Sequence, residues 1–182
     1  MTTDQILAAV EEHPTRFVVV TGGEPMIAKG MPDLLQGLRV AGKHITIETA
    51  GTVPPGGVAC DLASISPKLA NSTPSAAEAG EAWVQRHEQT RFRPEIIREW
   101  CEQFDYQLKF VISAENDIRE AEKLIEQLGI EVPAHKVLLM PEGLDAESLR
   151  ARTQMLIDVC KRTGYRLAPR LHIEWFGNKR GT

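Results

Sequence analysis

Short apolar segments alternate with helix-like segments along the chain, and this alternation limits the folds that it can adopt. The run FVVV at residues 17–20 is wholly apolar, as expected of a strand that is covered on both faces. The segment MPDLLQGLRVAG follows, with Pro32 near a helix start and Gly42 at its end, and then the β-branched segment HITIETAGT. This order predicts an α/β protein with a parallel sheet and right-handed crossovers. Both an open doubly wound sheet and a β/α barrel fit the pattern.

The same alternation continues toward the C-terminus. Further strands are predicted in VACDLASISPK, YQLKFVIS and KVLLMP, and further helices at 3–12, 94–104, 115–128 and 145–163. The apolar faces of the last two helices are expected to contain Ile118, Ala121, Leu124, Ile125 and Leu128, and Leu149, Leu156 and Val159. Residues 71–93 are rich in Ser, Ala, Glu and Gly and have weak periodicity, which indicates an insertion. We therefore expect residues 1–182 to form a single domain with one insertion.

Composition argues against several functional classes. The formal net charge is −4, so no overall positive field favours nucleic acid or an anionic membrane. No apolar run approaches the ~20 residues of a membrane-spanning helix, and the first residues lack the pattern of a signal peptide. The cysteines Cys60, Cys101 and Cys160 lie far apart and predict buried free thiols in a reducing cytoplasm. We expect a cytoplasmic protein that binds neither nucleic acid nor membrane.

Polar residues gather where the predicted strands end. These segments are Thr21-Gly22-Gly23-Glu24-Pro25, Glu48-Thr49-Ala50-Gly51-Thr52, Ser66-Pro67-Lys68, Ser113, Met140-Pro141-Glu142-Gly143 and Arg170-Leu171-His172. The carboxyl ends of parallel strands meet at one edge of a sheet, and ligands of such folds bind there. We therefore expect these loops to converge on a small zwitterionic or carboxylated ligand.

Each segment also has a simpler interpretation. Gly22 and Gly23 could supply positive φ to a tight turn, Glu48 and Lys68 could be surface charges, and His172 could be a core histidine. The sequence contains no G-x-G-x-x-G, no Walker-type G-K-[ST] and no G-x-S-x-G nucleophile elbow. The shared placement of the polar residues at one predicted edge is what favours a binding site.

Five segments taken together resemble the radical S-adenosylmethionine (SAM) enzymes: TGGEP, ETAGT, SPK, LKFV and LMPEG. The tail PRLHIEWFGNKRGT narrows the resemblance to the 7-carboxy-7-deazaguanine synthase family, which makes the deazapurine ring of queuosine and related nucleosides. The resemblance extends from about Thr3 to Thr182. It implies a partial, incomplete β/α barrel of the TIM type, formed by a truncated domain whose first strand is missing.

The resemblance assigns ligands to the loops at the strand ends. Residues implied in SAM binding are Gly22, Gly23 and Glu24 at the amino group, Ser66, Pro67 and Lys68 at the ribose and carboxylate, and Met140, Pro141, Glu142 and Gly143 along the adenine. Residues implied in binding the pterin substrate are Thr21, Arg170, His172 and the C-terminal Thr182. Carbonyl oxygens and a carboxylate suit an ammonium group, and glycines let the backbone approach it closely. No catalytic side chain and no metal ligand is assigned within the chain.

One feature of that family has no counterpart in this sequence. Members carry a loop of the type C-x-x-x-C-x-x-C whose thiolates hold a 4Fe–4S cluster, and a nearby threonine helps to bind Mg²⁺. The chain starts at what resembles the helix after this loop, and its own cysteines are predicted to be too widely spread to replace it. We therefore expect the cluster and Mg²⁺ to lack ligands in this chain, and the chain to be inactive by itself.

Three functional hypotheses remain. The first is a synthase without its N-terminal segment, whose complete form uses SAM radical chemistry for the ring contraction of 6-carboxy-5,6,7,8-tetrahydropterin with loss of ammonia. The second is a non-catalytic protein that kept the SAM-binding loops. The third is an α/β domain without a cluster that binds some other small carboxylate.

A missing first strand has a structural consequence. Residues 17–20 would then form an exposed apolar edge of the sheet, which tends to pair with another chain. We expect either self-association, as in a homodimer, or shielding of this edge by the helix at 3–12.

Overall fold

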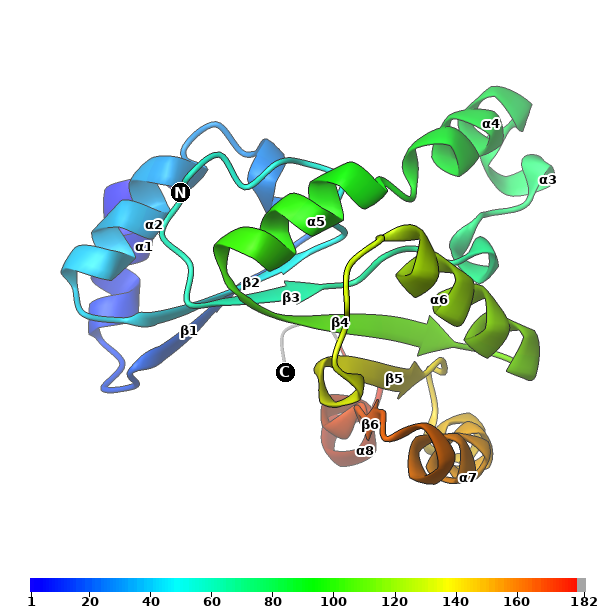
Figure 1. Ribbon diagram of the computed structural model, residues 1–182. Coiled ribbons are helices and arrows are strands. Elements are labelled where there is room, and N and C mark those ends of the chain that lie inside the picture. Colours follow the sequence, from blue (N-terminus) through cyan, green and yellow to red (C-terminus); the bar gives the residue numbers. More distant parts are fainter. Residues whose placement is uncertain (180–182) are drawn as a thin grey trace. The chain divides into compact units, whose positions relative to one another are not determined.

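The computed structural model describes residues 1–179 and divides into two compact units. The first unit comprises Met1–Ile65 and Glu95–Gln107. The second comprises Ser66–Pro94 and the chain from Leu108 onward. Figure 1 labels the helices and strands of both units.

Six strands form an open sheet in the order β1-β2-β3-β4-β5-β6. They are β1 (Phe17–Val20), β2 (His44–Thr49), β3 (Leu62–Ile65), β4 (Asp105–Ile112), β5 (Val137–Pro141) and β6 (Arg166–Leu167). Pairing is parallel between β1 and β2, β2 and β3, β4 and β5, and β5 and β6. A doubly wound sheet reverses its strand order at a switch point, whereas these strands keep the order of the chain. The predicted α/β class with an incomplete barrel is confirmed.

The helices of the first unit are α1 (Thr3–Glu11), α2 (Met31–Val40) and α5 (Pro94–Gln103). Those of the second unit are α3 (Ala76–Ala79), α4 (Glu81–Thr90), α6 (Glu115–Gln127), α7 (Ala146–Thr163) and α8 (Leu171–Phe176). Short 3-10 turns lie at η1 (Pro25–Ile27), η2 (Ala70–Ser72) and η3 (Ala134–Lys136). Within residues 1–179, no helix is both long and apolar enough to cross a membrane.

The core of the first unit lies between strand β2 and helix α2. Ile45 and Ile47 of β2 and Leu35 of α2 are fully buried. Helix α1 packs on α2 through a close approach at Gly37, where an added Cβ would lie 2.5 Å from Cδ1 of Leu7 (Figure 1). Any larger residue at this position would require the Leu7 side chain to move.

Strand β1 keeps an exposed apolar face. Phe17 and Val19 are 63% and 56% exposed, although Val20 on the opposite face is buried. Since α1 packs against α2, the predicted shielding by this helix does not cover the side chains of Phe17 and Val19. Self-association through this edge stays a prediction.

The predicted apolar helix faces of the second unit are confirmed. Ile118, Ala121 and Leu124 of α6 are buried, as is Leu128 just after its end, while Ile125 is half-buried. Helix α7 buries the three predicted residues Leu149, Leu156 and Val159. It ends at Gly164, whose φ of 76° is the left-handed conformation that suits glycine at a helix C-terminus.

Residues 71–93 contain most of η2 and the helices α3 and α4. As far as the structure describes these two helices, neither has a buried side chain. This explains the weak periodicity of the segment, because a helix without a buried face needs no apolar stripe. That the segment is an insertion stays a prediction.

Candidate ligand-binding loops

The TGGEP loop follows β1 in the first unit and is fastened to the end of β2 by Glu24. The Glu24 carboxylate accepts hydrogen bonds from the Thr49 hydroxyl at 2.8 Å and from the Ala50 N–H at 2.9 Å. It also accepts one from the N–H of Met26, within η1. Thr49 is 3% exposed, so without this acceptor its buried O–H would have nothing to donate to, although its oxygen also accepts the Gly51 N–H at 3.0 Å. Glu24 therefore fixes the position of the loop.

Gly22 and Gly23 leave the backbone of this loop uncovered. Both are exposed, and a Cβ added to either would meet no atom within 4 Å. Neither has a positive φ, so the interpretation that they supply positive φ to a tight turn is wrong. Because neither residue has a side chain, the peptide groups of the loop are open to a ligand.

A row of polar side chains crosses the first unit from this loop toward β4. The Thr21 hydroxyl donates to Glu48 Oε2 at 3.2 Å, and Glu48 is paired in register with Ser64 of β3. Gln107 Nε2 donates to the buried Ser64 hydroxyl at 3.0 Å. Sequence reasoning missed Ser64 and Gln107 because it considered only strand ends. They could have been found from strand periodicity, because alternate residues of a strand point to the same face of the sheet.

The SPK turn lies in the second unit beside a cavity of about 210 Å³. Its polar lining comes from loops that are distant in sequence: Ser66, Lys68, Asn71, Ser72, Ser113 and Glu142. Leu69, directly after the turn, is 2% exposed and anchors it in the core. The structure thus brings the predicted residues Ser66, Pro67 and Lys68 together with Glu142.

Asp117 organises the loop after β4, and sequence reasoning missed it. Its Oδ2 accepts hydrogen bonds from the N–H groups of Ser113 and Ala114, at 2.7 and 2.9 Å. Asn71 Nδ2 donates to the same oxygen at 2.8 Å and so joins this loop to the segment that follows the SPK turn. An acid in the first turn of α6 was the available signal, because carboxylates there pair with the free N–H groups of a helix start.

The MPEG segment at the end of β5 is divided between two cavities. Glu142 lines the cavity of the SPK turn and forms an ion pair with Arg152 at 3.3 Å. Pro141 instead lines a separate cavity of about 300 Å³ with Arg170. Other walls of this second cavity come from α7 and α8: Leu149, Arg150, Thr153 and Glu174. Met140 is half-buried, and Gly143 is buried.

The predicted pterin-binding residues have different surroundings. Arg170 donates from Nη1 to the Gly143 carbonyl at 2.8 Å, while its buried Nε has no hydrogen-bond partner among residues 1–179. His172 is exposed, so the interpretation as a core histidine is wrong. Thr21 belongs to the first unit, and Thr182 lies outside the described residues. That all these loops converge on one ligand stays a prediction.

The cysteines do not form a metal site. Cys60 and Cys101 belong to the first unit and Cys160 to the second. Burial raises the pKa of the Cys60 thiol to about 11 and also raises that of Cys160, which disfavours the thiolate form that binds iron. In the part of the chain that the structure describes, no three His, Cys, Asp or Glu residues are grouped to hold a metal ion. This donor set does not fit an iron–sulfur cluster.

Comparison with known proteins identifies relatives over the whole chain. A 7-carboxy-7-deazaguanine synthase from Rhodopirellula baltica is 40% identical over 182 residues, covering 100% of this chain and 69% of that protein. One from Halobacterium salinarum is 37% identical over 95% of this chain and 70% of its own length. The crystal structure of QueE from Escherichia coli superposes with a TM-score of 0.65 at 22% identity, over 93% of this chain and 64% of that one. No family model matches the chain.

The open parallel sheet with helices between its strands is the α/β fold that the chain shares with this QueE structure. The chain belongs to the 7-carboxy-7-deazaguanine synthase family. The resemblance inferred from its motifs is thereby confirmed.

Proposed function

We propose that this chain supplies the SAM- and pterin-binding surfaces of a 7-carboxy-7-deazaguanine synthase in queuosine and deazapurine biosynthesis. The proposed reaction is the ring contraction of 6-carboxy-5,6,7,8-tetrahydropterin with release of ammonia, a carbon–nitrogen lyase step. One observation carries the proposal: Glu24 fastens the TGGEP loop to Thr49 and Ala50 while Gly22 and Gly23 stay exposed. A loop that is fixed in position and has open peptide groups is suited to a small zwitterionic ligand.

The residues present fit SAM. The uncovered peptide groups at Gly22 and Gly23 offer carbonyl oxygens to its ammonium group. The cavity beside Ser66, Pro67 and Lys68 offers a hydroxyl and a cation to its ribose and carboxylate. The backbone of residues 140–143 is assigned to its adenine. In a complete enzyme SAM supplies the radical chemistry, and the role of these residues is to bind and orient it.

The pterin is assigned to Thr21, Arg170, His172 and Thr182. Support comes from the Arg170 guanidinium, whose buried Nε has no partner in the described chain and can donate to a carboxylate such as that of the pterin. The Thr21 hydroxyl donates to Glu48, so a substrate at this position would meet two acceptors, the Thr21 oxygen and the Glu48 carboxylate, which suit N–H groups of a pterin.

We propose further that a polypeptide of these 182 residues does not assemble the 4Fe–4S cluster or bind the Mg²⁺ of its family, and is inactive alone. The raised pKa values of the Cys60 and Cys160 thiols support this, because they disfavour the thiolate form that binds iron. Anaerobic reconstitution followed by iron and sulfide analysis is expected to find no cluster. A stoichiometric cluster would contradict the proposal.

A second candidate function follows from the same cysteines. A chain that cannot hold the cluster but keeps the loops could act as a non-catalytic protein that binds SAM or a small carboxylate. For either function we expect a cytoplasmic homodimer, with Phe17 and Val19 at the subunit interface, because these exposed side chains lie on an edge strand.

Anaerobic calorimetry separates these functions. Synthase-type surfaces predict binding of both SAM and 6-carboxytetrahydropterin, with the pterin affinity lowered in Arg170→Gln. A SAM-binding protein predicts binding of SAM alone. If a folded chain binds neither ligand, the synthase proposal is contradicted. The remaining hypothesis is then that the chain binds some other small carboxylate.

A further inference from the structure

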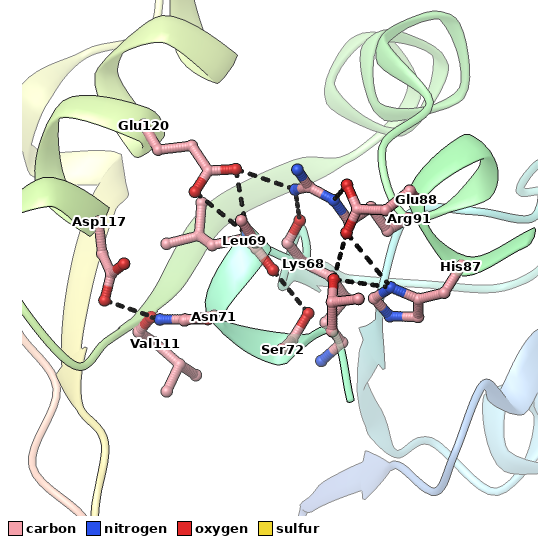
Figure 2. Close-up of polar contacts among 12 residues, drawn as sticks. Lys68, Leu69, Asn71, Ser72, His87, Glu88, Arg91, Val111, Asp117 and Glu120 are labelled. Atoms are coloured by element: carbon pink, nitrogen blue, oxygen red, sulfur yellow. Dashed lines mark hydrogen bonds and ion pairs between the residues drawn. The ribbon is translucent and has the colours of Figure 1, made fainter. Parts of the chain in front are cut away.

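Arg91 joins three segments of the second unit that lie far apart in the sequence. Its Nη1 donates to the Lys68 carbonyl at 2.7 Å and to Glu120 Oε1 of α6 at 3.0 Å. Its Nε donates to Glu88 Oε2 of α4 at 2.9 Å. Figure 2 shows the guanidinium between these two carboxylates, with the Lys68 carbonyl within reach of the same group. One side chain therefore ties the SPK turn to both helices.

The environment of Arg91 makes these contacts strong. The Arg91 side chain is 14% exposed and that of Glu120 is 25% exposed, so solvent and salt screen this ion pair less than they screen the pair with the more exposed Glu88. Burial alone would lower the pKa of Arg91, but hydrogen bonds to the Glu88 and Glu120 carboxylates outweigh it and raise this pKa. Charge-assisted hydrogen bonds of this kind are roughly twice as strong as neutral ones. Removal of the guanidinium would take away the cation that both the Glu88 and the Glu120 carboxylates bind.

The chain just after the SPK turn is held from the same two sides. Both oxygens of Glu120 accept the Ala70 N–H, at 3.1 Å each. The Thr73 hydroxyl donates to Glu88 and also contacts His87 Nδ1 at 3.2 Å. Residues 68–73 thus lie between α6 and α4, with Arg91 as the link that contacts both helices and the turn itself (Figure 2).

In the described structure, helix α4 has no fully buried side chain, and Val84 is its half-buried apolar residue. Trp83, its aromatic residue, is 50% exposed and stacks on His87 of the same helix. Polar contacts through Glu88, His87 and the adjoining Arg91 connect α4 with the segment after the SPK turn and with α6. This predicts that the order of α4 and the order of the turn depend on each other.

We propose that Arg91 is a positioning residue for SAM binding, which fixes the Lys68 carbonyl and holds the Ser66–Lys68 turn in its binding conformation. Residues 71–93 then act as a clamp on the turn, an inference that rests on the proposed role of the turn toward SAM. Arg91 does not contact the ligand in this account. It acts by pre-organisation, since a turn that is already ordered loses less conformational entropy on binding.

Hydrogen exchange tests the positioning role without any ligand. In Arg91→Gln, the amides of Ala70 and Thr73 are expected to exchange about tenfold faster, because the turn opens more often. Arg91→Lys keeps the charge but not the fork of donors, and is expected to fall between Arg91→Gln and the parent. The matched control is Arg119→Gln, on the surface of α6, where the arginine is 70% exposed and pairs with Glu115 at 3.8 Å. Unchanged exchange at Ala70 and Thr73 in Arg91→Gln would overturn the inference.

A titration with SAM tests the functional part. The dissociation constant is expected to rise about tenfold in Arg91→Gln and to stay within about twofold of the parent in Arg119→Gln. Faster exchange with unchanged SAM affinity would overturn the link between the clamp and binding. If the parent chain itself does not bind SAM, the proposed function fails, and the exchange result alone decides whether Arg91 holds the turn.

Discussion

The TGGEP loop of the first unit and the SPK turn of the second are fixed by different means. Glu24 holds the first loop through neutral donors, Thr49 and Ala50, at the end of the neighbouring strand. The second turn depends on charged residues, Arg91 and Glu120, that belong to a connecting segment and a helix. The TGGEP loop thus depends on one carboxylate that binds the end of a neighbouring strand, whereas the SPK turn depends on several charged residues from different segments. The two should respond differently to substitution and to pH.

The largest effect is expected at Glu24. Glu24→Ala leaves the buried Thr49 hydroxyl and the Ala50 N–H without acceptors, which predicts a loss of about 2–3 kcal/mol in the free energy of unfolding. Urea denaturation can measure this loss through Trp100, the fully buried tryptophan of the first unit. The control Glu48→Gln keeps an acceptor for the exposed hydrogen bond from Thr21 and is expected to cost under about 1 kcal/mol. Equal costs for the two variants would contradict the anchoring role of Glu24.

The second effect is expected at Asp117. Asp117→Ala removes the acceptor for the N–H groups of Ser113 and Ala114, which predicts a loss of about 1–2 kcal/mol, as for other helix-start carboxylates. The thermal midpoint reports this loss. Asp158→Ala on α7 is the control, because Asp158 is 70% exposed and its pair with Lys161 spans 3.9 Å. That control is expected to stay within about 0.5 kcal/mol of the parent.

The network of the second turn is expected to depend on pH. The hydrogen bond from Thr73, and then the contacts with Arg91, hold the pKa of Glu88 below its ordinary value. A depressed folded-state pKa means that the stabilisation is present above the ordinary pKa, about 4.3, and is lost as pH falls through the folded value. Proteolysis of residues 74–90 should therefore become faster below about pH 4.3, in step with protonation of Glu88. Glu88→Gln should weaken this pH dependence, and an unchanged dependence in Glu88→Gln would contradict the role assigned to Glu88.

The smallest effect on stability is expected at the exposed edge of the first unit. Val19→Lys should change the free energy of unfolding by less than about 0.5 kcal/mol, because Val19 is already 56% exposed. The same change should convert a homodimer to monomers, which light scattering can measure. A parent chain that is monomeric at all concentrations would rule out pairing through β1.

Sequence reasoning found those features that follow from local pattern. Alternating apolar and helical segments gave the parallel sheet, and the spacing of Ile118, Ala121 and Leu124 gave the buried face of α6. The placement of Thr21 near Glu48 follows directly from parallel pairing of β1 with β2.

The features that it missed depend on tertiary contacts. Glu120 and Ala70 are 50 residues apart, and Arg91 is 23 residues from the carbonyl that it binds. Neither pair has a periodic signal, and helix α4 has no apolar stripe to show where it lies. The role of Gly22 and Gly23 was also ambiguous. A glycine that is needed for a positive φ angle and a glycine that is needed because it has no side chain look the same in a sequence. Only the backbone conformation separates these two cases.

Calorimetric titration of the folded chain with SAM tests the central claim most directly. If the TGGEP loop and the SPK turn form SAM-binding surfaces, the parent should bind SAM with a stoichiometry of about one per chain. Binding should be lost in Glu24→Ala, weakened in Arg91→Gln and retained in Arg119→Gln. The absence of any binding by the folded parent, or equal affinity in all four proteins, would contradict the account.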